Sequence, residues 1–508
     1  TGNFPSVNSH GVQTGVAQQR SNYNFCSILS QARRIHSGDE KRSIIAQREV
    51  RGDEMGFIGP YDTAEGRSCG CNKSFAICTT VSIEFDGSVI ETCLAEIQEQ
   101  FKFEETVCVN APFLVFLNGV LLYQMASVGD LKGVHAHMLQ YRRCGIIDYG
   151  VSLLVRKQSL YIRTDGGRIL RPLFVVEALH RHLRMSLRPI AQESFEELLG
   201  AGIVEFVDSD EEDTKQVAES VQTITEGTEL CEIHPTLILS FNTAYGAPYC
   251  DNNQGPRVTY QNAMMKQSQS QIPLDFRSNM KSRTHSLLYG QKPLAATKLS
   301  QVKGFPLASG LNCIVCIGCF DGYNQEDSLI MNRAFIERGG FRMLDQKTFT
   351  YSGSEIVSNA SAQALWKKHD SKAFQHLDDD GMPCPGKTLS EDDIILSKYT
   401  TNEDEEKTDS SVKAKDKKGT IQRVMFGHGQ RRKKSSSADE SIKVNITSYE
   451  CRAPIVGDKL ASRMAQKGTI ARIEDPENLP FNTEGIVPDI IINPCCIPTR
   501  MTIGQLLE

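Results

Sequence analysis

The chain has 508 residues, of which 40% are hydrophobic and 23% charged, and its formal net charge at pH 7 is −6. These values are ordinary for a soluble globular protein of several domains, and they exclude collagen-like and strongly basic classes. No apolar run approaches a membrane span, and no secretory signal precedes the domain-like sequence. Both ends break off abruptly, so we expect a piece of a longer polypeptide.

The first elements predict a scaffold. The segment Gly59–Gly70 is rich in Pro and Gly, which predicts a loop. Farther along, Phe113–Leu117 predicts a strand that runs into an Asn118-Gly119 turn, and Val134–Arg143 predicts a helix. We expect the acidic run Asp208–Asp213 to be a solvated face.

A basic segment follows in this acidic chain. Between Asn252 and Lys303 there are eight lysine or arginine residues and one carboxylate, Asp275. Such concentrated charge favours an anionic partner such as a phosphate backbone. A solvated basic surface is equally consistent with the charge alone.

Three cysteines, Cys313, Cys316 and Cys319, have the spacing of a metal site but lie in an apolar stretch of strand type. Strand positions three apart point to opposite faces, whereas zinc needs converging ligands. We therefore expect buried apolar cysteines and no zinc site in this fragment. The irregular spacing of all sixteen cysteines favours reduced thiols.

The composition changes again between about Gly339 and Ser448. Few apolar residues occur between Thr400 and Lys418, and Arg431–Ser437 is basic and polar, which predicts a flexible loop. We expect the range Thr401–Ser437 to be dispensable for core folding. We interpret Arg431–Lys434 as an exposed loop in preference to a nuclear import signal.

Two carboxylate motifs remain. Ile83–Ser88 has Glu84 and Asp86 but a serine at the third acidic position, so we interpret it as a turn. Glu326 and Asp327 are adjacent in a Gly/Asn loop, and adjacent carboxylates repel unless a cation is near. The alternative is that Asp327 and Ser328 cap a helix beginning at Leu329.

The chain resembles the second-largest, beta-type subunit of multisubunit DNA-dependent RNA polymerases, in its eukaryotic or large-DNA-virus form. The resemblance is carried by six blocks in the family's order: Asp251–Gln267, Tyr289–Leu294, Gly322–Ser328, Gly457–Thr469, Glu484–Asp489 and Ile497–Thr502. Gly59–Gly70 is similar to the family's fork loop, and Thr164–Leu173 to its external domains.

The resemblance implies a mixed α/β multidomain fold, in which a wall or flap insertion interrupts a hybrid-binding domain with a double-psi β-barrel. The implied domains are a fork region (1–80), external regions 1 and 2 (81–185 and 186–234), the two parts of the hybrid-binding domain (235–338 and 449–508, the second truncated) and the insertion (339–448).

The activity implied by the resemblance is nucleotidyl transfer, which uses two Mg²⁺ ions. The largest subunit holds the tightly bound ion, so this chain alone is not expected to be catalytic. Implied partners are the largest and smaller polymerase subunits, the DNA template, the RNA transcript and nucleoside triphosphates, with no membrane. The implied location is the nucleus, or a cytoplasmic viral factory or virion.

The resemblance also implies roles for individual residues. Asp327 helps hold the second Mg²⁺ with Glu326 beside it, and Arg257 and Arg500 bind nucleotide phosphates, which a guanidinium fork suits. The remaining implied residues are Lys459, Lys467, Gln267, Tyr260 and Lys266 on the nucleic acid and Glu65 in the fork. Departures from the family occur at Met265 and at Met464-Ala465, where the family often has His-Gly.

Two other functions are compatible with parts of the sequence. A non-catalytic nucleic-acid-binding or assembly paralogue would be favoured by loss of Asp327, Arg257 or the two lysines, all of which are present. A self-sufficient metal-dependent nuclease or phosphohydrolase would need three or more converging acids, and the sequence shows at most two adjacent ones.

Overall fold

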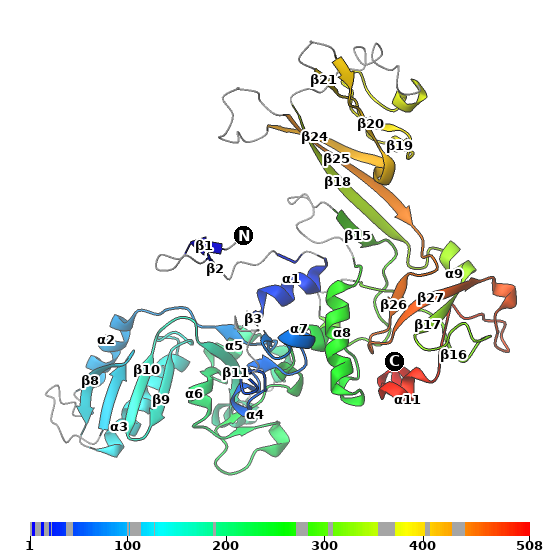
Figure 1. Ribbon diagram of the computed structural model, residues 1–508. Helices are drawn as coiled ribbons and strands as arrows, with labels where there is room; N and C mark the ends of the chain where they lie inside the picture. Colours follow the sequence, from blue (N-terminus) through cyan, green and yellow to red (C-terminus); the bar gives the residue numbers. More distant parts are fainter. Residues whose placement is uncertain are drawn as a thin grey trace. The chain divides into compact units, whose positions relative to one another are not determined.

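The computed structural model contains helices and several separate sheets, which confirms the expected mixed α/β class (Figure 1). It describes residues 3–5, 12–14, 20–21, 23–36, 44–98, 101, 113–125, 127–185, 189–270, 283–302, 308–353, 371–401, 407–428 and 442–508. The chain forms two compact units. The first unit is Thr1–Gln31, Gly246–Arg257 and Ala263–Glu508, and the second is Ala32–Tyr245 and Val258–Asn262.

The second unit contains a four-stranded sheet covered by two helices. Its order is β8 (Val120–Met125), β7 (Phe113–Leu117), β10 (Ser159–Arg163) and β9 (Ser152–Arg156). The turn between β7 and β8 has Asn118 and Gly119 in the left-handed region, as the sequence predicted. Helices α2 (Gly87–Ile97) and α3 (Val128–Arg143) bury their apolar faces against the strands, so this sheet has its own core.

A second sheet in this unit runs β12-β11-β14-β13, with β6 also paired to β11. Its strands are β6 (Thr80–Val81), β11 (Ile169–Val175), β12 (Val204–Asp208), β13 (Val217–Ala218) and β14 (Leu230–Cys231), and the helices nearby in sequence are α4 (Val176–Met185), α5 (Phe195–Gly200) and α6 (Ser209–Glu212). A small sheet of β3 (Arg34–His36), β5 (Asn72–Phe75) and β4 (Ile58–Gly59) flanks the predicted loop Gly59–Gly70.

The prediction of a solvated face was wrong for Asp208 and Glu211 of the acidic run, whereas Ser209 and Asp213 are exposed. Asp208 and Glu211 are buried, and Asp208 caps α6 by accepting from the Glu211 backbone N–H. The Arg142 guanidinium, from α3, donates to Glu211 at 2.8 and 2.9 Å and also pairs with Glu205. Lys215 lies 2.8 Å from Glu211. A buried charge network therefore joins the two sheets of the unit, and spacing alone could not reveal these distant cations.

The network changes the proton affinity of its acids. Burial alone would raise the pKa of the Glu205 carboxyl, but the charges of Arg142, Lys215 and Arg143 outweigh burial and hold its pKa below the ordinary value. The pKa of Glu211 is lowered in the same way against burial, chiefly by Arg142 and Lys215. An acid whose pKa falls on folding stabilises the fold above its unfolded pKa, and that contribution is lost as pH falls.

We expect Arg142→Met to lower the free energy of unfolding by about 3–5 kcal/mol near pH 7, because it leaves two buried carboxylates without their main cation. This decrease in the free energy of unfolding should become smaller toward pH 4, where Glu205 and Glu211 become protonated. The measurement is urea unfolding of the chain by circular dichroism at several pH values. Arg181→Met is the matched control, because its exposed pair with Glu177 contributes about 0.5 kcal/mol or less. Equal effects of both variants would contradict a structural role for the network.

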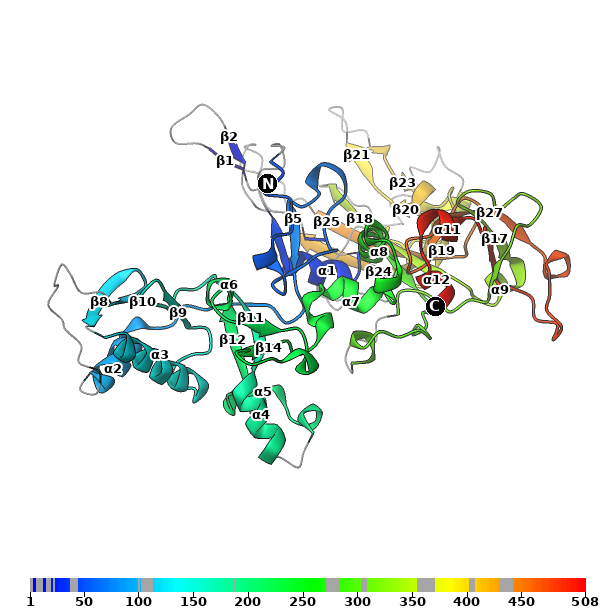
Figure 2. The same cartoon turned by 90° about the horizontal axis from the view of Figure 1, so that it is seen from below.

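The first unit contains a long sheet that the composition did not predict. Strands β18 (Met343–Gly353) and β25 (Ile442–Arg452) pair over their full length, and β24 (Gly419–His428) pairs with β25. The three run side by side as the longest strands in Figures 1 and 2. Strands β15 (Arg283–Leu287) and β19 (Thr388–Leu389) flank them, and β20 (Ile394–Leu396), β23 (Val412–Lys413), β21 (Tyr399–Thr401) and β22 (Lys407–Asp409) form two small ladders.

The expected flexible loop is therefore wrong for the described part of Thr401–Ser437. Ala414 and Ile421 are buried in an apolar cluster with Val444 and Ile446 of β25. The exposed Lys415 and Lys418 lie close in sequence to these buried residues, and composition alone does not separate the two kinds. Arg431–Ser437 lies outside the described residues.

We expect Ile421→Ala to cost about 2–5 kcal/mol, because it opens a cavity in this cluster. Phe426→Ala on the same strand is the matched control and should cost far less, since that ring is 63% exposed. The check is the thermal transition of both variants against the parent chain. Deleting Thr401–Ser437 removes β24 and should abolish cooperative melting of the sheet; retained cooperativity would restore the flexible-loop interpretation.

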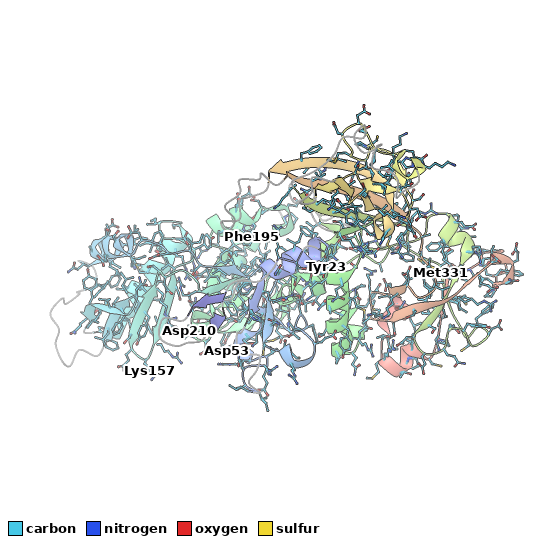
Figure 3. The ribbon with its side chains drawn as sticks, turned by 45° about the horizontal axis from the view of Figure 1, so that its top comes forward. Tyr23, Asp53, Lys157, Phe195, Asp210 and Met331 are labelled. Carbon is cyan, nitrogen blue, oxygen red and sulfur yellow. The ribbon has the colours of Figure 1, made fainter. Side chains whose placement is uncertain are left out.

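The second sheet of the first unit holds the residues of greatest interest. Its order is β16 (Val315–Ile317), β28 (Ile490–Ile492), β17 (Ser328–Asn332), β27 (Lys467–Glu474) and β26 (Lys459–Ala461). Figure 3 labels Met331, which lies fully buried on the central strand β17.

The remaining helices and strands of the described residues are β1 (Asn3–Pro5), β2 (Val12–Thr14), α1 (Phe25–Ala32), α7 (Phe241–Gly246), α8 (Gly255–Gln267), α9 (Arg333–Glu337), α11 (Cys496–Arg500) and α12 (Gly504–Leu507).

Across the part of the chain that the structure describes, no helix combines the length and apolar character needed to span a bilayer.

Candidate functional site

The hairpin of β26 and β27 places two lysines on one face of its sheet. Lys459 lies opposite Thr469, and Ala461 lies opposite Lys467. Directly opposed residues share a face and strand residues alternate between faces, so Lys459 and Lys467 point the same way. Both are exposed. The other face is apolar, because Leu460 and Ile470 pack with Leu329.

Asp327 lies beside this basic face. Strand β17 runs parallel to β27 with Ser328 opposite Thr469, and the Thr469 backbone N–H donates to the Asp327 carbonyl at 2.9 Å. A Cβ on Gly468 would lie 2.8 Å from that carbonyl oxygen, so this close approach needs glycine. Because Ser328–Asn332 is a strand, the alternative that Asp327 caps a helix at Leu329 is wrong.

The loop before Asp327 is held from within. The buried amide of Asn324 donates to the Gly318 carbonyl at 2.6 Å and accepts from the Phe320 N–H at 3.1 Å. Glu326 has φ +54°, a left-handed conformation that costs a residue with a side chain about 1–2 kcal/mol. The Asp327 side chain is 54% exposed. The loop therefore presents both carboxylates at the surface in a fixed backbone conformation.

Arg500 reaches Asp327 from the end of α11. Its Nη2 forms an ion pair with an Asp327 carboxylate oxygen, and its Nη1 donates to Gln466 Oε1 at 2.8 Å. Gln466 Nε2 donates to Thr502 Oγ1 at 2.6 Å. Burial raises the pKa of the neighbouring Cys496 thiol, which favours its protonated form. Three segments far apart in sequence thus meet at one guanidinium.

The first turn of α8, which carries Arg257, lies against the residues after Arg500. Asn253 forms an isolated bridge with Thr502, and its Oδ1 accepts from the Gly504 N–H at 3.1 Å. The Gln254 N–H donates to the Met501 carbonyl at 3.3 Å. The structure therefore brings together the backbone segments that carry Arg257 and Arg500.

Other predicted site residues lie elsewhere. Lys266 and Gln267 are in the last turn of α8, about 13 Å along the helix from Arg257 at 1.5 Å per residue. Tyr260 and Glu65 belong to the second unit, where the exposed Glu65 precedes the short turn Gly66–Ser68. Of the basic segment, Arg277, Lys281 and Lys303 lie outside the described residues.

Two other motifs have structural roles. Asp86 caps α2 by accepting from the Ser88 N–H at 3.0 Å, and this backbone hydrogen bond lowers the pKa of Asp86. Cys313 packs with Leu329 and Met331, whereas Cys316 packs in a different cluster, so the two diverge as predicted. Cys319 is exposed, contrary to expectation, because β16 ends at Ile317.

The arrangement suits anions with an accompanying hard cation. Arg500, Lys459 and Lys467 supply fixed positive charge, and Asp327 and Glu326 supply oxygen ligands of the kind that Mg²⁺ prefers. Within the described ranges, no three His, Cys, Asp or Glu side chains converge on one point. These two carboxylates therefore fit part of a ligand set rather than a whole one.

Sequence reasoning missed the residues that organise this site. Gln466, Thr502, Asn253 and Asn324 are neutral and polar, so neither charge nor a metal-ligand spacing marks them. All four stand within the recognised blocks, which was the available signal. Their importance follows from hydrogen bonds between distant segments.

We expect Asn324→Ala to loosen the carboxylate loop by about 1–3 kcal/mol, because the half-buried Gly318 carbonyl and Phe320 N–H lose their partner. Hydrogen exchange should accelerate at residues 318–328 before the sheet itself opens. Gln325→Ala changes an exposed neighbour in the same loop and is the control. Unchanged exchange in Asn324→Ala would show that the loop is held by other contacts.

Comparison with known proteins gives consistent matches along the chain. The model described as RNA polymerase Rpb2, domain 6, matches residues 243–508. The models for domain 4 and domain 3 of the same protein match residues 115–177 and 18–81. The largest match covers more than half of the chain and includes the whole candidate site.

Curated relatives match the chain from end to end. It is 33% identical to DNA-directed RNA polymerase II subunit RPB2 of Encephalitozoon cuniculi, over 100% of the chain and 46% of the relative. It is also 33% identical to DNA-directed RNA polymerase II subunit 2 of Arabidopsis thaliana, over 100% of the chain and 45% of the relative. Identity to DNA-directed RNA polymerase subunit Rpo2 of Sulfolobus acidocaldarius is 30%, over 98% of the chain and 46% of the relative. The chain thus spans less than half the length of these relatives.

Proposed function

Since the chain belongs to the family of second-largest subunits of DNA-directed RNA polymerases, we propose that it is part of a core polymerase subunit. It contributes contacts to nucleotide phosphates, to a second Mg²⁺ and to the RNA–DNA hybrid, in an active site shared with the largest subunit. The reaction is attack of the RNA 3′ hydroxyl on the α-phosphate of a nucleoside triphosphate, with loss of pyrophosphate. It proceeds only in the assembled complex.

One observation carries the proposal: a carboxylate and a guanidinium are paired next to two exposed lysines. Asp327 and Arg500 are 173 residues apart in sequence and form an ion pair. Lys459 and Lys467 share the adjacent sheet face. Asp327, Lys459 and Lys467 are exposed and Arg500 is half-buried, so the group is accessible and mixed in sign, as binding of a metal-bound polyphosphate requires.

Each side chain has a distinct task in this proposal. Arg500 binds phosphate oxygens through its planar donors, and Arg257 adds a second fork from the first turn of α8. Lys459 and Lys467 hold the 3′ end of the RNA as point charges. Asp327, with Glu326 beside it, supplies ligands to Mg²⁺. Bound there, the ion would neutralise phosphate charge and orient the triphosphate.

The finer architecture is proposed on the same grounds. The sheet β16-β28-β17-β27-β26 belongs to the double-psi β-barrel of the hybrid-binding domain (235–338 and 449–508). The sheet of β18, β24 and β25 belongs to the wall or flap insertion (339–448). The fork (1–80) and the external regions (81–185 and 186–234) make up the rest, with Glu65 in the fork and Tyr260, Lys266 and Gln267 along the RNA.

The proposed partners are the largest and smaller polymerase subunits, template DNA, RNA and nucleoside triphosphates. The proposed location is the nucleus, on the likeness to eukaryotic RNA polymerase II subunits. A non-catalytic paralogue is the second candidate, and the presence of Asp327, Arg257, Lys459 and Lys467 speaks against it.

We expect Asp327→Ala to slow nucleotide addition about a hundredfold in a polymerase reconstituted with the full-length subunit, because a charged group at the reacting phosphates is lost. Assembly should be intact, and the dependence of rate on Mg²⁺ concentration should shift upward. A wild-type rate of nucleotide addition with wild-type dependence on Mg²⁺ in the Asp327→Ala variant would refute the metal-binding role of Asp327.

Variants that remove one phosphate contact each should have measurable kinetic effects. Arg257→Ala and Arg500→Ala should raise the apparent KM for nucleotides, and Lys459→Ala and Lys467→Ala should shorten the lifetime of the RNA-bound complex. Each loss at the nucleic acid should lower the log–log salt slope by about one. Lys413→Ala is the control, since this lysine lies on β23 near Asp392. A control effect as large as the others would mean that the charge acts diffusely.

A further inference from the structure

Gln466 is a neutral side chain that contacts Arg500, one of the charged groups of the candidate site. It follows the buried pair Met464 and Ala465 and directly precedes Lys467 at the start of β27. Its carboxamide contacts Arg500, Cys496 and Thr502, which all come from the segment that contains α11. No charge or catalytic chemistry attaches to it, so its contribution has to be found in the geometry.

The orientation of this amide is fixed by its neighbours. One end lies 3.3 Å from the Cys496 carbonyl oxygen, which can only accept a hydrogen bond. That end must therefore be the Nε2 donor, which also donates to Thr502 Oγ1 at 2.6 Å. A flipped amide would place two oxygens together. Oε1 consequently faces Arg500 and accepts from its Nη1 at 2.8 Å.

The anchor behind the amide is rigid. Thr502 is fully buried, its N–H donates to the Ile497 carbonyl at 3.2 Å, and its backbone bridges to Asn253 before α8. On the other side Ala465 is buried with φ +57°, which sets the direction in which Gln466 leaves the turn. The amide is therefore held at both its backbone and its far end.

The guanidinium of Arg500 is held at two points of different character. Nη2 is paired with the carboxylate of Asp327, which is 54% exposed, and Nη1 is bonded to the neutral amide. Of the five guanidinium N–H donors, these two bonds use two and leave three. A neutral acceptor keeps the positive charge available, whereas a carboxylate at position 466 would cancel it. The amide thus orients the arginine without competing with an anion.

We propose that Gln466 is a positioning residue that holds Arg500 in its phosphate-binding orientation, a role that rests on the proposed function. When the Asp327 carboxylate turns to a cation, Arg500 loses its charged partner. The bond to Gln466 then keeps the long side chain from reorienting, so its ordering entropy is not lost again at each binding event. Gln466 acts through Arg500 alone and touches neither the nucleotide nor the RNA.

The test is a double-mutant cycle in polymerase assembled with the full-length subunit, with KM and kcat measured for nucleotide addition. Gln466→Ala should raise KM about tenfold, the equivalent of one hydrogen bond to a charged group, and change kcat by less than about twofold. Arg500→Ala should raise KM at least as much. The double variant should match Arg500→Ala, because residues that act as one unit are not additive.

The control and a second variant keep the result decisive. Gln422→Ala removes a glutamine on β24 that accepts from Gln346 at 2.6 Å, and it should leave KM unchanged. If Gln466→Ala does not assemble, Thr502→Val frees the far end of the amide and should raise KM with the same non-additivity.

Three outcomes overturn the proposal. They are an unchanged KM in the assembled Gln466 variant (or in Thr502→Val where only that variant assembles), an additive double variant, and a loss confined to kcat. An unchanged KM in Arg500→Ala would instead refute the phosphate role in the proposed function, so the two failures are distinguishable.

Discussion

The pairing of β17 with β27 and β28 is the constraint on which the candidate site depends. Ser328 is registered against Thr469, and Leu329 against Ile492, so one strand end aligns three distant segments. Leu329 and Met331 pack into one apolar cluster and Ile330 into another on the opposite face, so a shift by one residue would move each side chain into the wrong cluster. The close approach at Gly468 and the position of Asp327 follow from the same ladder.

The charge network around Arg142 and the ion pair of Arg500 with Asp327 both join an arginine to carboxylates, but they differ in burial. Arg142 is buried and its charge is neutralised by Glu205 and Glu211, so breaking these ion pairs would destabilise the fold. Arg500 faces one carboxylate that is half exposed and one amide that is neutral. Exposure makes the second pair exchangeable. The Asp327 carboxylate can therefore exchange Arg500 for a cation, whereas Glu205 and Glu211 cannot leave Arg142 without cost.

Local elements were the part of the fold that the sequence predicted well. The Asn118-Gly119 hairpin and the α3 helix depend on neighbours in sequence, and the divergence of Cys313 and Cys316 follows from strand alternation. The acidic run and the supposed loop near Ala414 failed because their burial is decided by partners far along the chain, Arg142 and β25. Composition alone does not separate the exposed Lys415 and Lys418 from the buried Ala414 and Ile421 close to them in sequence.

The candidate site also has residues that the sequence identified and residues that it did not. Asp327 and Arg500 were identified through the resemblance, and their ion pair in the structure is consistent with it. The lysine face of β26 and β27 could not be read from sequence, because it requires the register of a hairpin. Gln466 and Asn324 could not be identified as site residues from the sequence, because the role of a side-chain amide depends on the groups that its oxygen and nitrogen contact.

The ladder of β17 has a consequence for biosynthesis. Its partner strands begin with Lys467 and Ile490, and translation at 5–20 residues per second separates them from β17 by on the order of ten seconds. During that interval the nascent chain carries an apolar strand with two unpaired edges outside the ribosome, a state prone to aggregation. A holdase chaperone bound to Leu329–Met331 would protect it. The arrangement that joins distant segments into one site thus leaves β17 without its partner strands until β27 and β28 have been synthesised.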